Sequence, residues 1–468
     1  MADRPEFDGN PKNLVRTAKA ADIASPHPIY VVWEITLKCD LGCKHCGSRA
    51  GFARSNELST EECFDLAEQM AENGVREVTL IGGEAYLRDD WHRIARKITD
   101  LGMACSMTTG ARNLSPERID LAEQSGIRSI SISLDGLEAT HDAQRGAKGS
   151  WKAAVEASRR ITASSMRLTT NSQINRLSMP EFPALADLLV DIGSKGWQIQ
   201  LTVAMGRAAD RPELLLQPYD LLELFPILVW VKENKLTPNG IRLFPGNNIG
   251  YFGPYEELLR YGGDLGAHWS GCSAGKWSLG FEADGKIKGC PSLPSTEYTG
   301  GNIRDRSLAD IVENTPELRY LRERTREDLW GFCKTCYYGD VCKAGCTWTS
   351  HCLLGRPGNN PYCIHRALDF ERRGLRERVV KREDAPGLPF DNGRYEIVVE
   401  PMPQDASATV LGVELTELLE LQSKDKGVWS PTEMRDRLTR QSTGTTHETL
   451  TRFEEHQGGI VANPNPPG

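Results

Sequence analysis

Residues 30–46 read Tyr-Val-Val-Trp-Glu-Ile-Thr-Leu-Lys-Cys-Asp-Leu-Gly-Cys-Lys-His-Cys, a short apolar run followed by three cysteines. The cysteines are Cys39, Cys43 and Cys46, with three and then two residues between them. A loop this tight can present three thiolates to one side and hold three irons of a four-iron cluster. The fourth iron then stays free to take a small chelating ligand, and this is where chemistry can occur.

Two other interpretations apply to the three cysteines. They could form a zinc knuckle completed by His45, or they could be core cysteines that lie together by chance. Zinc sites favour two closely spaced pairs separated by a longer gap, and His45 lies too near Cys46 to complete a tetrahedron comfortably. The spacing therefore favours the iron–sulfur cluster.

The composition predicts an enzyme-sized cytoplasmic protein. A chain of 468 residues exceeds the size of one hydrophobic core, so two or three domains are expected. A net charge of −8 makes nucleic acid an unexpected partner. The polar start of the chain and the lack of a long apolar run predict no signal peptide and no membrane partner. In the reducing cytoplasm, thirteen cysteines are better explained as metal ligands than as disulfides.

Strand-like runs alternate with amphipathic helical stretches from residue 30 to 205. The expected strands are 30–35, 77–81, 104–108, 129–134, 167–170 and 197–202, and helices are expected at 60–73 and 116–125. This alternation is typical of parallel βα units, and six strands suffice for a partial (β/α)6 TIM-like barrel in the α/β class. The cysteine loop follows the first strand, at the end of the barrel where active sites form.

The expected domains follow from shifts in composition. Residues 1–29 are an N-terminal segment, 30–205 the partial barrel, 206–270 a bridge lining the barrel mouth, 271–383 a module organised by metal, and 384–468 a small α+β domain. The bridge has an apolar helix at 221–231, and its loop at 244–255 either packs structurally or lines a substrate; both remain open. A charged helix at 366–382 is expected to lead into a linker at 384–387. The last domain has a winged-helix-like order, with a helix starting at Ser430, and a disordered end.

A second motif, Gly82-Gly83-Glu84, follows the second expected strand. Two glycines allow the backbone to approach a bound group closely, and Glu84 adds a negative charge that suits an ammonium group. Taken alone, the three residues could equally be a turn.

With these two motifs, residues 30–205 resemble the radical S-adenosylmethionine (SAM) enzymes. The resemblance implies that SAM chelates the open iron of a [4Fe-4S] cluster and is reductively cleaved to a 5′-deoxyadenosyl radical, which abstracts a hydrogen. It implies that SAM is bound by Gly82, Gly83, Glu84, Ser133, Asp135 and Arg145, with Arg145 able to fork onto the carboxylate of the cofactor. His45 replaces an aromatic residue of many relatives and could pack near adenine.

A second set of cysteines resembles the seven-cysteine SPASM extension, which carries two auxiliary iron–sulfur clusters. The resemblance implies one cluster, the distal one, on Cys333, Cys336, Cys342 and Cys363. The cluster nearer the barrel would be held by Cys272, Cys290 and Cys346, which is one ligand short. Its fourth ligand could be Cys352, His268, solvent or a substrate group, or the cluster could be of a smaller type; a zinc ribbon is the alternative for the whole set. Cys63 and Cys105 are expected in the core.

The resemblance favours a maturase that attacks a residue of a ribosomally made precursor peptide, giving a cross-link or an oxidised residue. The alternative is a radical oxidase acting on a small molecule or on a folded protein, as sulfatase maturases do; an iron–sulfur carrier without turnover would not need the open iron. The expected partners are the peptide and a flavodoxin- or ferredoxin-type reductant, and the C-terminal domain could recognise a leader peptide by strand addition. No general acid or base can be named.

Overall fold

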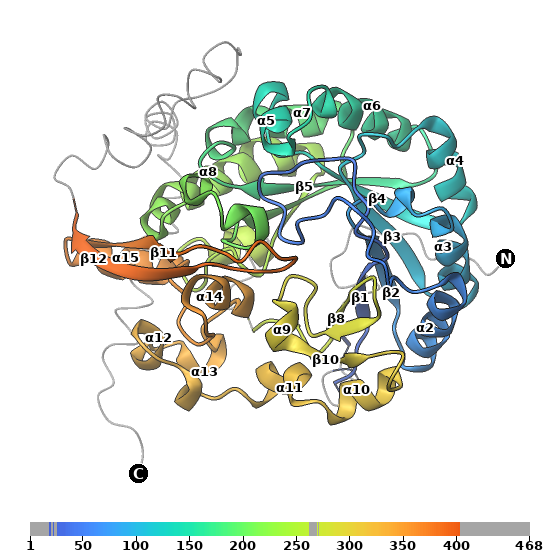
Figure 1. Cartoon of the computed structure of the whole chain (residues 1–468). Coiled ribbons are helices and arrows are strands. Elements are labelled where there is room, and N and C mark those ends of the chain that lie inside the picture. The colour runs from blue at the N-terminus through green and yellow to red at the C-terminus, as the bar shows by residue number, and fades with distance from the viewer. Residues whose placement is uncertain (1–17, 20–21, 23–25, 262–268, 270, 403–468) are drawn as a thin grey trace.

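The computed structural model describes residues 18–402 apart from 20–21, 23–25, 262–268 and 270. Figure 1 shows an arc of strands surrounded by helices, with a cysteine-rich region and a two-stranded hairpin on one side. The winged-helix-like arrangement and the helix expected at Ser430 lie outside the described residues, as do His268 and most of 1–29.

Ten strands form the main sheet of the described part of the chain, in the order β10-β9-β8-β1-β2-β3-β4-β5-β6-β7. The strands are β1 (Tyr30–Glu34), β2 (Glu77–Ile81), β3 (Ala104–Thr109), β4 (Ile127–Ser133), β5 (Arg167–Ile174), β6 (Gly196–Leu201), β7 (Arg242–Pro245), β8 (Ser278–Phe281), β9 (Lys286–Lys288) and β10 (Thr299–Asn302). The six predicted strands are confirmed as β1 to β6, which pair in parallel in chain order. The sheet has two outer strands, β10 and β7, so the barrel is partial and does not close.

Two parallel strands extend this sheet beyond the six that the sequence pattern predicts. Strand β7 pairs with β6, and β8 pairs with β1 in the register Tyr30↔Ser278. Since β8 belongs to the cysteine-rich module, that module is joined to the barrel through a continuous sheet. The carboxyl ends of β1 and β8 therefore lie side by side at the barrel mouth.

Helices between the strands cover the outer face of the sheet (Figure 1). They are α2 (Thr60–Glu72), α3 (Trp91–Asp100), α4 (Pro116–Gln124), α5 (Glu138–Arg145), α6 (Ser150–Thr162) and α7 (Phe182–Asp191). Their starts are encoded locally: Ser59 and Glu62 form a capping box at α2, and Ser115 caps α4, with Pro116 in its first turn. Their apolar faces join strand residues such as Val31, which is fully buried, in one core.

Helix α8 (Leu221–Val231) has the bounds expected from the sequence and is buried against the barrel. In the described residues, the helical stretch Pro212–Asn239 is long and apolar enough to cross a membrane, and 83% of its most apolar window is buried inside the fold. Such burial is what a core helix shows.

The cysteine-rich region is built from short helices: α9 (Ser295–Tyr298), α10 (Leu308–Asn314), α11 (Pro316–Glu323), α12 (Phe332–Thr335), α13 (Gly339–Cys342), α14 (Thr347–Leu354) and α15 (Ile364–Arg372). The prediction of one helix over 366–382 is wrong. Helix α15 ends before Gly374, whose φ of +67° suits glycine, and the chain continues as β11 (Leu375–Glu383).

Strand β11 pairs antiparallel with β12 (Arg394–Pro401) to form a two-stranded hairpin. Its alternating charges face opposite charges across the ladder, as in Arg376 with Glu400, which favours a strand over a helix here. The segment expected to be a linker at 384–387 is part of the connection within this hairpin.

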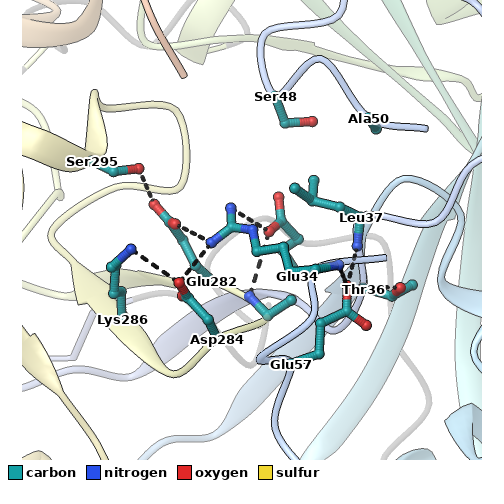
Figure 2. A network of polar contacts seen from close by, with 12 residues as sticks. Glu34, Thr36, Leu37, Ser48, Ala50, Glu57, Glu282, Asp284, Lys286 and Ser295 are labelled. Atoms are coloured by element: carbon teal, nitrogen blue, oxygen red, sulfur yellow. Dashed lines mark hydrogen bonds and ion pairs between the residues drawn. The ribbon is translucent and has the colours of Figure 1, made fainter. Parts of the chain in front are cut away.

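A buried network of charges lies where β1 and β8 end (Figure 2). Arg54 is at its centre: its guanidinium lies 3.2 Å from Glu34, 2.8 Å from Glu282 and 3.0 Å from Asp284. Lys288, which is fully buried, lies 2.7 Å from Glu282. Burial raises the pKa of Glu34 to about 7 in spite of Arg54. The network ties the loop after the three cysteines to the cysteine-rich module.

Replacing Glu34 with glutamine should change how stability depends on pH. The pKa of Glu34 is about 7 in the folded protein against an ordinary value of 4.5, so the folded state holds this proton more tightly. Stability from this group is therefore present below pH 4.5 and is lost as pH rises through 7. We expect Glu34→Gln to gain up to about 3 kcal/mol relative to the wild type between pH 5 and pH 8. Denaturant unfolding of both proteins at pH 5 and pH 8 measures this gain. If the difference in unfolding free energy between variant and wild type is the same at both pH values, the raised pKa of Glu34 is contradicted. Glu68→Gln, at a half-exposed ion pair, is the control.

Candidate functional site

The three-cysteine loop follows β1 at the barrel mouth, as predicted. Amide N–H groups lie near its sulfurs: Leu41 N donates to Cys39 Sγ and Ala50 N to Cys46 Sγ, both at 3.4 Å. Burial, with the nearby charge of Glu84, raises the pKa of the Cys39 thiol to about 12. Such thiols stay protonated until a metal ion replaces the proton, so metal binding is expected to release protons.

Gly82 and Gly83 make the close approach that the sequence predicts, but the group they approach is the cysteine loop itself. A Cβ on Gly83 would lie 2.3 Å from the carbonyl oxygen of Lys38, and one on Gly82 would lie 2.6 Å from that of Thr36. Backbone hydrogen bonds close this contact, from Gly83 N to Thr36 O and from Glu84 N to Lys38 O, both 2.8 Å. The glycines therefore lock the end of β2 against the cysteine loop.

We expect Gly83→Ala to displace the cysteine loop, because its methyl group has no space beside Lys38. A shift of about 1 Å can lower a reaction rate about a hundredfold, and a loss of that size is expected in reductive SAM cleavage. Gly51→Ala is a matched control in the same loop region, since a Cβ there meets nothing within 4 Å. Iron content and 5′-deoxyadenosine yield of both variants test this; unchanged values for Gly83→Ala would contradict it.

Glu84 is fixed in a buried position beside the cysteines. Its Oε1 accepts a hydrogen bond of 2.7 Å from Gly110 N, and its other oxygen accepts one from the Thr109 hydroxyl. Burial raises its pKa to about 7. The ligand atoms of Cys39, Asp40 and Glu84 all lie within 4.8 Å of one another, so this carboxyl group can reach a ligand bound beside Cys39. Thr109, the last residue of β3, and Gly110, which follows it, were not predicted. A polar residue and a glycine at a strand end are the signal that could have found them.

Asp135, Arg145 and His45 form a buried ionic group. Asp135 Oδ2 lies 2.7 Å from Arg145 Nη2 and 3.3 Å from His45 Nε2. Burial would raise the pKa of Asp135, but Arg145 and His45 outweigh burial and keep that pKa below its ordinary value. Burial lowers the pKa of His45 to about 4. Arg145 Nη1 also lies 3.7 Å from Cys43 Sγ, so this group connects the end of β4 with the cysteine loop.

These contacts refine two expectations from the sequence. His45, expected as a flat ring near adenine, is engaged with Asp135. Arg145, expected to fork onto a carboxylate, has both terminal nitrogens in contact with the chain. Ser133 donates its hydroxyl to Asn171 Oδ1 on the neighbouring strand at 3.2 Å.

Four of the SPASM-like cysteines lie around one cavity. Cys333, Cys336, Cys342 and Cys363 line it, together with aromatic side chains such as Tyr251. The structure thus gathers the set expected for the distal cluster. Four sulfurs with an apolar surround suit a closed iron–sulfur cluster, which needs no open position.

The other three cysteines form a separate group. Burial is the main cause that raises the pKa of the Cys272 thiol, and the charges of Cys346 and Cys290 raise it further. The three cysteines therefore influence one another. Cys352 is fully buried. Burial raises the pKa of its thiol, and the charge of Cys346 raises it further. Cys352 packs on Val203, on the barrel side of this group. Cys63 and Cys105 are core residues, as predicted.

Tyr251 lies between the two groups of cysteines. Its hydroxyl accepts a 2.8 Å hydrogen bond from Cys346 N, and its carbonyl oxygen lies 3.5 Å from Cys363 Sγ. Its ring packs on Gly345, where a Cβ would come within 2.2 Å of it. The bridge loop at 244–255 therefore packs against the cysteine-rich module.

Two segments of the chain match known protein families. Residues 33–188 match the radical SAM superfamily, and residues 272–337 match the SPASM iron–sulfur cluster-binding domain. An AdoMet-dependent heme synthase of Methanosarcina barkeri is 28% identical over 72% of this chain and 97% of its own. The mycofactocin maturase MftC of Mycobacterium ulcerans is 29% identical over 75% of this chain and 93% of its own.

Solved structures agree in fold. SuiB of Streptococcus suis bound to SAM has a TM-score of 0.56 at 16% identity, covering 69% of this chain and 74% of SuiB. The enzyme anSMEcpe with bound AdoMet has a TM-score of 0.55 at 16% identity, covering 74% of this chain and 97% of its own.

The matches and the cysteine loop at the barrel mouth define a radical SAM enzyme. More particularly, the chain is a radical SAM enzyme of the SPASM type, whose cofactors are SAM, a [4Fe-4S] cluster and auxiliary iron–sulfur clusters. The residues fit these groups: three cysteines share the loop after β1, and four more surround one cavity.

Proposed function

We propose that this enzyme modifies a residue of a ribosomally made precursor peptide. One electron from a flavodoxin- or ferredoxin-type reductant breaks the C5′–S bond of SAM and gives methionine and a 5′-deoxyadenosyl radical. That radical takes a hydrogen atom from the peptide, and the peptide radical then loses one electron to yield a cross-link or an oxidised residue. The observation that carries this proposal is the similarity to a maturase across 93% of the length of that protein.

Each group of candidate site residues would have a role in this reaction. Cys39, Cys43 and Cys46 would hold the cluster that bonds SAM, and Glu84 would receive the ammonium group of SAM. Gly82, Gly83 and Ser133 would line the same site, with Asp135 and Arg145 behind it. Cys333, Cys336, Cys342 and Cys363 would hold the distal auxiliary cluster. Cys272, Cys290 and Cys346 would hold the nearer one, whose fourth ligand could be Cys352, His268, solvent or a substrate group.

A groove beside the hairpin supports a peptide substrate. It has a volume of about 490 Å³ and lies between β12 and the loop around Trp330. Its walls carry aromatic side chains and arginines, two of which pair with Glu383 and Glu396 on the same walls. Arg356 lies 3.9 Å over the Trp330 ring. Such walls suit an extended peptide with aromatic and charged residues.

The test is anaerobic reconstitution with iron and sulfide, followed by incubation with SAM, a reductant and short peptides encoded beside the gene. We expect 5′-deoxyadenosine to increase with one of these peptides and the peptide mass to change. Deuterium transfer from a labelled residue into 5′-deoxyadenosine would identify the attacked position. Cleavage of SAM that no neighbouring peptide stimulates would count against the peptide proposal.

A second candidate is a radical oxidase acting on a small molecule, and the similarity to a heme synthase across 97% of that protein favours it. The same assay with carboxylate-bearing tetrapyrroles separates the two. For either candidate we propose a cytoplasmic enzyme without nucleic-acid or membrane partners.

A further inference from the structure

The β11–β12 hairpin projects its connecting loop toward the middle of the barrel (Figure 1). The loop tip, Gly387–Asn392, lies outside both segments that match family models. Asn392 forms a bridge with Met205, which follows β6. The tip is thus attached to the rim of the barrel mouth, at a residue that is far from it in sequence.

The tip also touches the cysteine loop directly. Phe390 N donates to Gly47 O at 3.1 Å, and Gly206 N donates to Asp391 O at 2.8 Å. The side chain of Asp391 accepts a hydrogen bond of 2.8 Å from Arg49 Nε and one of 2.6 Å from Gly387 N. It therefore holds both the turn and the cysteine loop. These contacts place the tip beside Cys46, at the position where SAM chemistry starts.

Phe390 reaches from there toward the nearer auxiliary group. Phe390 is 8% exposed, and its side chain packs with Met205 and Cys352. On another side, Lys288 Nζ lies 3.9 Å from the ring centroid, two residues before Cys290. Phe390 therefore contacts the cysteine loop through its backbone, and its ring contacts residues beside the nearer auxiliary group.

The backbone at Phe390 is strained. Its φ of +59° belongs to the left-handed region, which a residue with a Cβ adopts at a cost in free energy. Glycine would remove that cost, so the presence of a bulky aromatic residue indicates a role for the ring.

We propose that the hairpin tip is a wall of the reaction chamber and that Phe390 is a specificity-determining residue that limits what reaches the radical. This inference rests on the proposed radical chemistry. A substrate must bring a C–H bond to the 5′ carbon of SAM beside the cysteine loop, and it must pass the Phe390 ring. The same ring keeps small molecules of the medium away from the radical.

The test uses perdeuterated glycerol as the probe, because it needs no knowledge of the substrate. The reconstituted holoenzyme is reduced with dithionite in the presence of SAM and this probe. The electron breaks the C5′–S bond, and a radical that meets glycerol takes one deuterium atom and leaves a glycerol radical. The deuterated fraction of 5′-deoxyadenosine then measures access to the radical.

We expect Phe390→Gly, which removes the ring and suits the backbone, to raise this fraction at least about fivefold. Phe390→Trp should stay at the wild-type level, as should Leu388→Ala, which alters an exposed residue of the same tip. An unchanged fraction in Phe390→Gly with normal iron content would overturn the proposal. If the glycine variant loses its iron, Phe390→Leu decides by the same measurement. Failure of the wild type to form 5′-deoxyadenosine would instead refute the radical function.

Discussion

We expect Cys43→Ala to abolish reductive cleavage of SAM, with the yield of 5′-deoxyadenosine falling at least about a thousandfold. Cys43 is the middle cysteine of the loop after β1, and its Sγ lies 3.7 Å from Arg145 Nη1. Without it, the loop offers two sulfurs in place of three. The variant should also lose about four irons per chain, because a four-iron cluster cannot stay bound at this site. Iron analysis and mass spectrometry of the reaction measure both effects.

Cys105→Ala is the matched control for this variant. Cys105 is fully buried in the core and contributes to no group of candidate ligands. It should keep its iron and its activity while losing some stability. Intact SAM cleavage in Cys43→Ala, or zinc bound in place of iron, would refute the cluster assignment.

The parallel core of the fold could be predicted because its signals are local. Strands such as β1 and β2 are short, mostly apolar runs, β4 alternates apolar and polar residues, and helices such as α2 and α4 begin at marked caps. Strands β7 and β8 could not be predicted in their places, since the four residues of β8 become the neighbour of β1 only through pairing across the chain. Strand β11 was missed because its charges fit a solvent-exposed helix equally well, and only the pairing with β12 decides between the two structures.

In the candidate site, too, the sequence predicts the residues with local signals and misses the contacts between distant segments. Cysteine spacing predicts which residues can bind metal, because spacing within a loop fixes how sulfurs can converge. It does not predict partners that arrive from distant strands, such as His45 beside Asp135. No sequence pattern predicts the contact between Arg49 and Asp391, which are 342 residues apart.

We expect Asp135→Ala to have the second large effect, on stability as well as on activity. The carboxylate of Asp135 is fully buried and lies 2.7 Å from the guanidinium of Arg145, which is 9% exposed. Removing it leaves a buried cation without its partner, which typically lowers the free energy of unfolding by about 3–5 kcal/mol. Since Arg145 also contacts Cys43, the loop should lose order, and SAM cleavage should fall with stability.

Asp210→Ala separates this effect from the loss of any ion pair. Asp210 lies 2.6 Å from Arg49, but its side chain is 45% exposed, and Arg49 keeps Asp391 as a partner. A pair of this kind contributes about 0–1 kcal/mol, so the control should unfold near the wild-type denaturant concentration and retain SAM cleavage. Equal losses in the two variants would mean that burial of the Asp135–Arg145 pair does not matter. A loss confined to Asp135→Ala, measured by denaturant unfolding and by 5′-deoxyadenosine yield, would show that the ionic group behind the cysteine loop maintains both the fold and the radical site.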